Sequence, residues 1–439
     1  MTAAAVILWG REIGAISVDG PGELPAFQYR PEFVRSGIEV APLRMPLRHE
    51  PYEFPGLLSE EPFMGLPGLV ADALPDRWGQ TLINAWLDAN GRDEASFDIV
   101  ERLCYIGTRG MGALEFQPAV EQPAATGEDL RVDLLVDLAN EVLSAREEFV
   151  AELSANPTET EMRAILAIGT SAGGARPKAI IAFNESTGQV RSGQIDAGAG
   201  FTHWLLKFDG VDKAGDHGLR DPQGWGALEF AYSKMAQAAG IEMTECRLLP
   251  ENSRRHFLTR RFDRTDTGEK LHVQTIAALE HINYNRAGTY SYERAFMLMR
   301  RLGLKAPQAE QLYRRMVFNV IARNQDDHVK NISFVMTKDG AWKLSPAYDL
   351  TWSYKPGNVW LEAHQMTIND KRDGFQREDL LAVAKTAGLK RGTGERVIAQ
   401  IADIVGEWKR FADEVDVDES MRDAAARSHR LYLAQPSVV

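Results

Sequence analysis

The sequence contains little cysteine, and this limits how the fold can be stabilised. Its 439 residues include only Cys104 and Cys246, too few for a disulfide framework or a four-cysteine zinc site. The nine histidines are scattered and show no H-E-x-x-H spacing. We therefore expect a chain from a reducing compartment, without structural zinc.

Long apolar runs are also missing. No stretch approaches the roughly 18 to 20 apolar residues of a membrane-spanning helix, and the start "MTAAAVILWGREIG" has no basic region before its short apolar run. With 44% hydrophobic and 26% charged residues, the composition is typical of globular proteins. The sequence predicts a cytoplasmic protein that does not enter a membrane.

Basic residues are outnumbered by acidic ones. The chain has 50 Lys and Arg against 62 Asp and Glu, a net charge of −12. Binding to nucleic acid through an overall positive field is therefore not expected. The short basic segments at 258–264 and 313–316 are interpreted as solvated faces or local ion pairs.

Three zones follow one another along the chain. Residues 1–118 are rich in Pro, Gly and short strand-like runs, and residues 119–160 form a polar linker with one amphipathic helix. Strands follow from about residue 161, and helices dominate after about residue 285.

A glycine-rich segment, "AIGTSAGGARPKAIIAFN", covers residues 167–184. Glycines at such positions let backbone N–H groups approach an anion, but the spacing is neither a Walker A loop nor G-x-G-x-x-G. The segment leads into an expected strand at 178–183, the turn "NESTG" and a return strand at about 189–194. On this evidence alone, a phosphate-binding loop and an ordinary hairpin connection remain equally acceptable.

The next predicted strand, "THWLLKFDG", carries Lys207 in its interior. A lysine in an apolar strand must reach solvent or meet a negative charge. A nucleotide phosphate is one such charge, as in kinases whose strand lysine pairs with ATP. A solvent-facing position is the alternative interpretation.

The segment "NVIARNQDDHVKN" at 319–331 follows a predicted helix at 311–322, whose apolar residues recur at helical spacing. Negative charge is unfavourable at a helix C-terminus. Helix capping therefore does not account for the two adjacent carboxylates.

A β-hairpin is predicted after this segment, with its turn at 339–340. Counting outward from a two-residue loop pairs Asn331 with Tyr348, so Asn331 and Asp349 become neighbours, with Asp326 close by. Such oxygen ligands suit Mg²⁺, which takes one or two carboxylates completed by phosphates and water.

The spacing of these residues points to phosphoryl transfer. In the protein-kinase catalytic loop, an Asp that orients the acceptor hydroxyl precedes a metal-binding Asn by five residues, and a later Asp holds the metals. Asp326, Asn331 and Asp349 repeat this order, with His328 and Lys330 inside the loop. Lys330 is placed to reach the transferring phosphoryl group.

At this level of detail the sequence resembles the HipA family of serine/threonine kinases, the toxin components of bacterial type II toxin-antitoxin pairs. The resemblance extends over nearly the whole chain. The matching segments are "GLPGLVADALPDRWG" (65–79), "RGMGALEF" (109–116), "SAGGARPK" (171–178), "RRFDR" (260–264), "DDHVKN" (326–331) and "LSPAYDL" (344–350).

The resemblance implies an α+β fold, with a small strand-rich N-terminal domain packed on a kinase-like domain. The implied divisions are an N-terminal domain (1–118), a linker and helix (119–160), a mixed N-lobe with the glycine-rich loop (161–285) and a helical C-lobe with the catalytic loop and metal site (286–439).

It also implies a role for individual residues. Asp326 becomes the catalytic base, assisted in the loop by His328 and Lys330, and Asn331 and Asp349 become Mg²⁺ ligands. The expected ATP contacts are Ser171, Gly173, Gly174, Lys178, Lys207, Arg261 and Phe262, and Ser171 is the expected autophosphorylation site that switches the kinase off.

Two departures from the family concern adenine recognition and the protein substrate. Position 260 is Arg where an acidic residue is expected, so adenine recognition is assigned to the backbone there, and segment 272–285 is less acidic than expected. The resemblance implies a protein substrate such as an aminoacyl-tRNA synthetase, a helix-turn-helix antitoxin of the HipB type, and contact with DNA only through that antitoxin. The alternatives are a small-molecule or lipid kinase and an inactive nucleotide-binding co-repressor.

Overall fold

The computed structural model describes residues 1–75, 80, 87, 93, 96–118, 150–152, 178–193, 197–210, 223–251 and 254–435. The chain forms two compact units, which we describe separately. The first unit contains Met1–Lys207, Asp263–Asn283 and Val335–Ala341, and the second contains Phe208–Phe262, Tyr284–Phe334 and Trp342–Val439.

An antiparallel sheet of five strands, in the order β4-β3-β2-β1-β5, opens the first unit. Buried and exposed residues largely alternate along its strands, as expected of a sheet with one face on a core. Helix α4 (Ile99–Ile106) packs on β1 and β5 and is capped by Asp98. The strands are Thr2–Leu8 (β1), Arg11–Val18 (β2), Ala26–Tyr29 (β3), Tyr52–Glu53 (β4) and Leu114–Pro118 (β5).

A second set of antiparallel strands in this unit runs in the order β9-β7-β8-β6. In the turn after β7, Asn184 Oδ1 accepts the backbone N–H of Ser186 at 3.0 Å, so the predicted turn forms through an asparagine side chain. The strands are Val150–Glu152 (β6), Lys178–Phe183 (β7), Gln189–Ser192 (β8) and Thr202–Lys207 (β9). The strands predicted from the sequence at 178–183 and from about 189 are confirmed.

Short elements complete the first unit. They are α1 (Pro31–Val34), η1 (Pro55–Leu57), α2 (Gly68–Ala71), β12 (His272–Thr275) and α8 (Ile276–Glu280). Helices α2 and α8 pack together.

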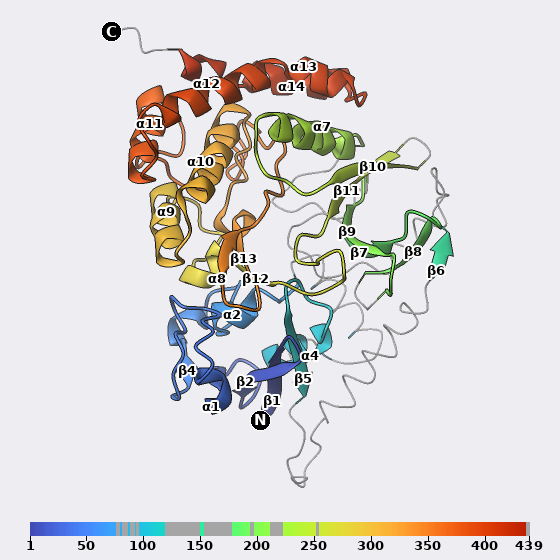
Figure 1. Ribbon diagram of the computed structural model, residues 1–439, viewed down its shortest axis with the longest axis vertical. Coiled ribbons are helices and arrows are strands. Elements are labelled where there is room, and N and C mark those ends of the chain that lie inside the picture. The colour runs from blue at the N-terminus through green and yellow to red at the C-terminus, as the bar shows by residue number, and fades with distance from the viewer. Residues whose placement is uncertain are drawn as a thin grey trace. The chain divides into compact units, whose positions relative to one another are not determined.

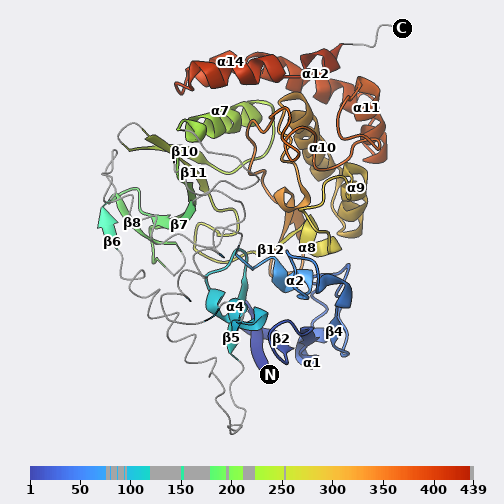
Figure 2. The same cartoon turned by 180° about the vertical axis from the view of Figure 1, so that it is seen from behind.

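The second unit is mainly helical. Its central helix α10 (Ala306–Ile321) packs against α9 (Tyr292–Arg301), α11 (Arg377–Thr386) and α12 (Thr393–Gly406), and Figure 1 shows it among them. Helix α7 (Trp225–Ala238) packs against α13 (Trp408–Asp413). Figure 2 shows α7 from behind. The unit also contains the hairpin β10 (Cys246–Glu251) and β11 (Arg254–Arg260), then α14 (Glu419–Ser428) and η5 (Leu431–Ala434).

The predicted α+β fold class, with strands concentrated early and helices late, is confirmed. The helix predicted at 311–322 is the C-terminal part of α10, and its apolar residues Leu312, Met316 and Val320 are fully buried. Among the residues that the structure describes, no helix is both long and apolar enough to span a membrane.

The hairpin of β13 (Ser333–Met336) and β14 (Trp342–Leu344) corrects one expectation. Thr337 N–H donates to Ala341 O at 3.2 Å, and Ser345 N–H donates to Ser333 O at 3.0 Å. The loop therefore has three residues rather than two, and the predicted pairing was wrong by one residue. Gly340, with φ of +83°, supplies the left-handed residue that closes such a three-residue loop.

Candidate active site

The loop that carries Asp326 begins where α10 ends. Arg323 has a φ of +60°, which few non-glycine residues adopt, and it turns the chain out of the helix. Asn324 N–H then donates to Asn319 O at 2.9 Å. The loop closes in the short 3-10 helix η4 (Val329–Asn331).

Asp326 and Asn331 belong to one closed loop. The Asn331 side-chain amide donates to the Asp326 carbonyl at 2.8 Å. The Asp326 carboxylate is 40% exposed, and its Oδ1 accepts the indole N–H of Trp360 at 2.7 Å. The five-residue step from Asp326 to Asn331 therefore spans a fixed loop that presents one carboxylate to solvent.

Asp349 lies beside this loop. Its φ is +53°, a left-handed conformation in which Asp and Asn are enriched, and its carbonyl accepts the Asn324 side chain at 3.3 Å. Asp349 and Asn331 both line a cavity of about 20 Å³, enough for one water molecule or ion.

The cavity offers oxygen ligands for a hard cation, and the buried Arg315 also lies on its lining. Asn324 also lines it, and its buried Oδ1 accepts no hydrogen bond from the residues that the structure describes. In the described part of the chain, no group of three or more His, Cys, Asp or Glu is arranged to hold a metal ion. That donor set suits Mg²⁺, which keeps several waters and phosphate oxygens, better than a metal that needs an all-protein cage.

His328 and Lys330 point to the same aromatic side chain. The His328 ring lies 5.6 Å from the Tyr284 ring, and the Lys330 ammonium lies 4.9 Å from the same ring centre. His328 Nε2 is 3.8 Å from Asp326 Oδ1, too far for a hydrogen bond. Both residues belong to the loop, and His328 lies within ion-pair distance of the Asp326 carboxylate without a hydrogen bond to it.

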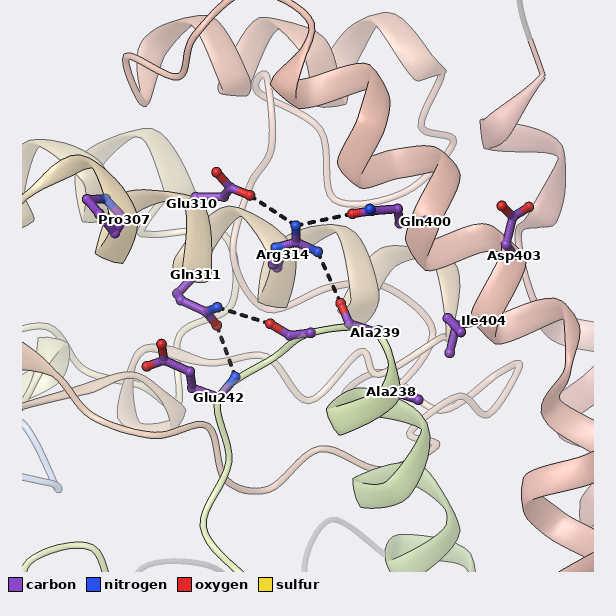
Figure 3. A pocket seen from close by; sticks show the side chains of 11 residues that line it. Ala238, Ala239, Glu242, Pro307, Glu310, Gln311, Arg314, Gln400, Asp403 and Ile404 are labelled. Atoms are coloured by element: carbon purple, nitrogen blue, oxygen red, sulfur yellow. Dashed lines mark hydrogen bonds and ion pairs between the residues drawn. The ribbon is translucent and has the colours of Figure 1, made fainter.

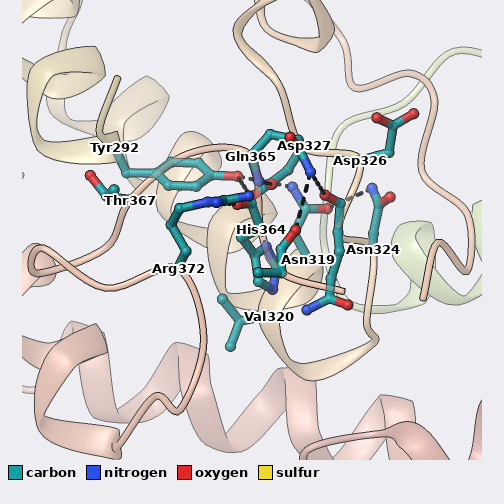
Figure 4. Close-up of polar contacts among 12 residues, drawn as sticks. Tyr292, Asn319, Val320, Asn324, Asp326, Asp327, His364, Gln365, Thr367 and Arg372 are labelled. Carbon is teal, nitrogen blue, oxygen red and sulfur yellow. Dashed lines mark hydrogen bonds and ion pairs between the residues drawn. The ribbon is translucent and has the colours of Figure 1, made fainter. Parts of the chain in front are cut away.

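Asp327, the second carboxylate of the pair, has a different environment. It is 2% exposed. Its Oδ2 accepts the Tyr292 hydroxyl and lies 2.9 Å from His364 Nδ1, and its Oδ1 accepts Gln365 N–H at 2.8 Å. Figure 4 shows these groups converging on Asp327 while Asp326 stands apart.

This network fixes the His364 tautomer. Arg430 Nη1 lies 3.1 Å from His364 Nε2, and arginine can only donate. Nε2 is therefore the acceptor, and the proton on Nδ1 is donated to Asp327. The chain of contacts ties the C-terminal segment to the base of the catalytic loop.

The segment predicted to meet adenine lies at the end of β11. Arg261 is 4% exposed, and the Phe262 ring stacks on Tyr348 at 5.5 Å between ring centres. The Tyr348 hydroxyl donates to the Lys330 carbonyl at 2.7 Å. Phe262 is thereby connected to the loop that carries Asp326.

Lys178 and Lys207 lie in the first unit and face each other across β7 and β9. Like charges directly opposite each other destabilise a sheet, and Lys178 is only 2% exposed. Both side chains have interactions within the protein. The predicted contacts Ser171, Gly173 and Gly174 lie outside the described residues.

A separate cavity of about 670 Å³ lies between the end of α7, α10 and α12. Arg314 spans it, donating to Ala239 O, Glu310 and Gln400 at 3.0 to 3.1 Å, as Figure 3 shows. None of the predicted site residues that the structure describes lines this cavity. Its polar contacts hold α10 against its neighbours.

Sequence reasoning missed several residues around Asp326. Tyr284, Trp360, His364 and Arg430 are distant in sequence from the loop and follow no motif. Asn324 and Asp327 lie within the loop, but nothing in the pattern separates a buried carboxylate from its exposed neighbour.

Known families match both parts of the chain. The HipA-like C-terminal domain matches residues 170–408, more than half of the sequence, and the HipA N-terminal domain matches residues 4–117. The chain belongs to the HipA family. This confirms the resemblance seen in the sequence motifs.

The fold is also found among solved structures. A chain of the Shewanella oneidensis MR-1 toxin-antitoxin complex of HipA, HipB and its operator DNA superimposes with a TM-score of 0.64. That match has 18% identity and covers 98% of this HipA-family chain and 96% of the Shewanella chain. The shared fold therefore extends along almost the whole chain.

The sequence match to a curated relative covers a smaller part of the chain. A Haemophilus influenzae protein named "Putative kinase" is 26% identical over 159 residues, which is 32% of this chain and 46% of the relative. The match thus spans just under half the length of that relative.

Proposed function

We propose that this HipA-family chain is an ATP-dependent kinase that phosphorylates Ser or Thr of a protein substrate. The observation that carries the proposal is the loop in which Asn331 is bonded to Asp326 while Asp349 lines the same small cavity. This arrangement supplies, in the kinase order, a carboxylate for the acceptor hydroxyl and oxygen ligands for a metal.

In the proposed reaction, the acceptor hydroxyl oxygen bonds to the γ-phosphorus of ATP while the bond to the β–γ bridging oxygen breaks. Asp326 receives the hydroxyl proton, and ADP leaves. Lys330, 4.9 Å from the Tyr284 ring centre, is assigned to the transferring phosphoryl group, and His328 to the shape of the loop.

Asn331 and Asp349 would hold Mg²⁺, which when bound neutralises phosphate charge. Lys178 and Lys207 are assigned to the ATP phosphates together with the loop that contains Ser171, Gly173 and Gly174. Backbone groups at Arg261 and Phe262 are assigned to adenine.

The proposed biological context is that of a toxin in the cytoplasm. The Shewanella complex contains HipB and operator DNA, and this supports a HipB-like antitoxin as the partner that carries the present chain, with its net charge of −12, to DNA. We propose a translation factor such as an aminoacyl-tRNA synthetase as the substrate, and autophosphorylation of Ser171 as the off-switch.

The test is transfer of ³²P from [γ-³²P]ATP by the purified full chain, with Mg²⁺ or with EDTA. The acceptors are the chain itself and the proteins of a heat-inactivated bacterial lysate. We expect Mg²⁺-dependent label on phosphoserine or phosphothreonine, with Ser171 identified by mass spectrometry. Absence of transfer to any protein would contradict the protein-kinase assignment, and label only on other residues would contradict the role of Ser171.

A further inference from the structure

The indole of Trp360 donates to one oxygen of the proposed base. The distance from Trp360 Nε1 to Asp326 Oδ1 is 2.7 Å. Asp326 Oδ2 accepts no side-chain or backbone hydrogen bond from the residues that the structure describes. One oxygen of the carboxylate is thus held by the indole, and the other is left to accept a hydrogen bond from a ligand.

The turn that carries Trp360 is built independently of any ligand. Asn358 Oδ1 accepts the backbone N–H groups of Trp360 at 3.0 Å and Leu361 at 2.9 Å, and Lys355 N–H donates to Leu361 O at 3.2 Å. Val359 is 86% exposed, so this turn lies at the protein surface.

Gln365 joins the turn to the catalytic loop. Its side-chain amide donates to the carbonyls of Trp360 and Gln325, and its backbone N–H donates to Asp327. The backbone of Trp360 is therefore tied both to its own turn and to the loop whose Asp326 the indole contacts.

We infer that Trp360 is a positioning residue for phosphoryl transfer, fixing Asp326 so that Oδ2 meets the acceptor hydroxyl. An indole N–H can donate but cannot accept a proton, so the contact orients the carboxylate without competing for the transferred proton. A hydrogen bond to an ionised group is also stronger than one between neutral groups. This inference rests on the proposed kinase function.

Trp360→Phe keeps an aromatic ring beside His328 and removes the N–H. We expect kcat for ³²P transfer to fall about 10- to 100-fold, the size of effect expected when a reacting group is misplaced, with KM for ATP and the melting temperature unchanged. The matched control is Trp352→Phe, which loses an indole hydrogen bond to Ser428 at 3.0 Å and should retain parental kcat.

A parental kcat in Trp360→Phe would overturn the inference. So would a parallel change in KM for ATP and melting temperature, because that pattern indicates a purely structural role. If the parent chain transfers no phosphate, the kinase proposal fails, and the contact is judged separately by NMR.

The NMR arm uses the ¹⁵N-labelled full chain. The Trp360 indole N–H resonance is assigned by its loss in Trp360→Phe or Trp360→Tyr. Asp326→Asn should shift this resonance and leave the Trp352 indole resonance in place. An unmoved Trp360 resonance would show that the indole does not hold Asp326.

Discussion

Asp326 and Asp327 are consecutive carboxylates in opposite surroundings. Asp326 is 40% exposed and accepts one hydrogen bond through its side chain, from Trp360. Asp327 is 2% exposed, and both of its oxygens are engaged by Tyr292, His364 and Gln365. The Asp326 carboxylate can still accept a hydrogen bond from a ligand. The Asp327 carboxylate directs no hydrogen-bond acceptor to solvent.

The difference shows how the two faces of one loop are treated differently by the fold. A buried carboxylate is costly unless its hydrogen bonds are made, so Asp327 fixes the position of the backbone next to Asp326. The segment is therefore buried and hydrogen-bonded at Asp327 and exposed at Asp326. Substituting each residue in turn separates chemistry from support.

The largest effect is expected at Asp326. Asp326→Asn keeps the size of the side chain but removes the proton acceptor, and we expect phosphoryl transfer to fall about 10²- to 10⁴-fold. Its melting temperature and ATP affinity should match those of the parent. Near-parental transfer rates in a ³²P assay would remove Asp326 from the role of base.

Asp327→Asn should produce the opposite pattern. The NH₂ group of the new amide would face one of the donors that now bond to the carboxylate, and a donor cannot bond to a donor. We expect the free energy of unfolding to fall by about 2 to 4 kcal/mol. Differential scanning calorimetry should show a melting temperature lower by roughly 2 to 4 °C for a chain of 439 residues. Asp326→Asn is the matched control, and equal melting temperatures for the two variants would refute the contrast.

Substitution of Asp349 tests whether this residue is a metal ligand. We choose Asp349→Asn because Asn also tolerates the left-handed backbone, with φ of +53° at this position. Titration calorimetry should show Mg²⁺-dependent tightening of ATP binding weakened by about 10- to 100-fold, with little change in stability. An unchanged Mg²⁺ dependence would return Asp349 to a structural role.

The smallest expected effect is a loss of folding stability at acidic pH through the buried His429. Burial, with a smaller contribution from Arg323, lowers the pKa of His429 to about 4, below an unfolded value of about 6.5. Between these values the unfolded chain binds more protons, so stability falls as the pH falls. At pH 5.5 His429 should account for roughly 1 kcal/mol of lost stability.

His429→Gln can retain a donor to the Tyr232 hydroxyl, which lies 3.0 Å from His429 Nε2, but it does not titrate. Thermal unfolding between pH 7 and pH 5.5 should therefore depend less on pH in this variant. An identical pH dependence in parent and variant would contradict the assignment.

Local patterns predicted much of the fold. The helical spacing of Leu312, Met316 and Val320 correctly placed the end of α10, and the apolar run at 178–183 correctly placed β7. These predictions were correct because burial imposes a period on neighbouring residues. The hairpin register was wrong because an Asp-Gly pair suits both a two-residue and a three-residue loop.

Only those parts of the site whose residues are closely spaced in the sequence could be predicted. The step from Asp326 to Asn331 is local, so the sequence indicated the loop. Trp360 and Arg430 reach the loop through tertiary packing, and no periodic pattern or motif reports such contacts. The roles of the individual residues remain predictions.

The central claim is that Asn331 and Asp349 hold the metal of a phosphoryl-transfer site served by Asp326. The most direct measurement is a crystal structure of the full chain with Mn²⁺ and the non-hydrolysable analogue AMP-PNP, using the anomalous signal of manganese to locate the ion. We predict an anomalous peak bonded to both side chains and to analogue phosphate oxygens, with the γ-phosphate facing Asp326. A metal–nucleotide complex bound elsewhere, with Asn331 and Asp349 uninvolved, would contradict the account.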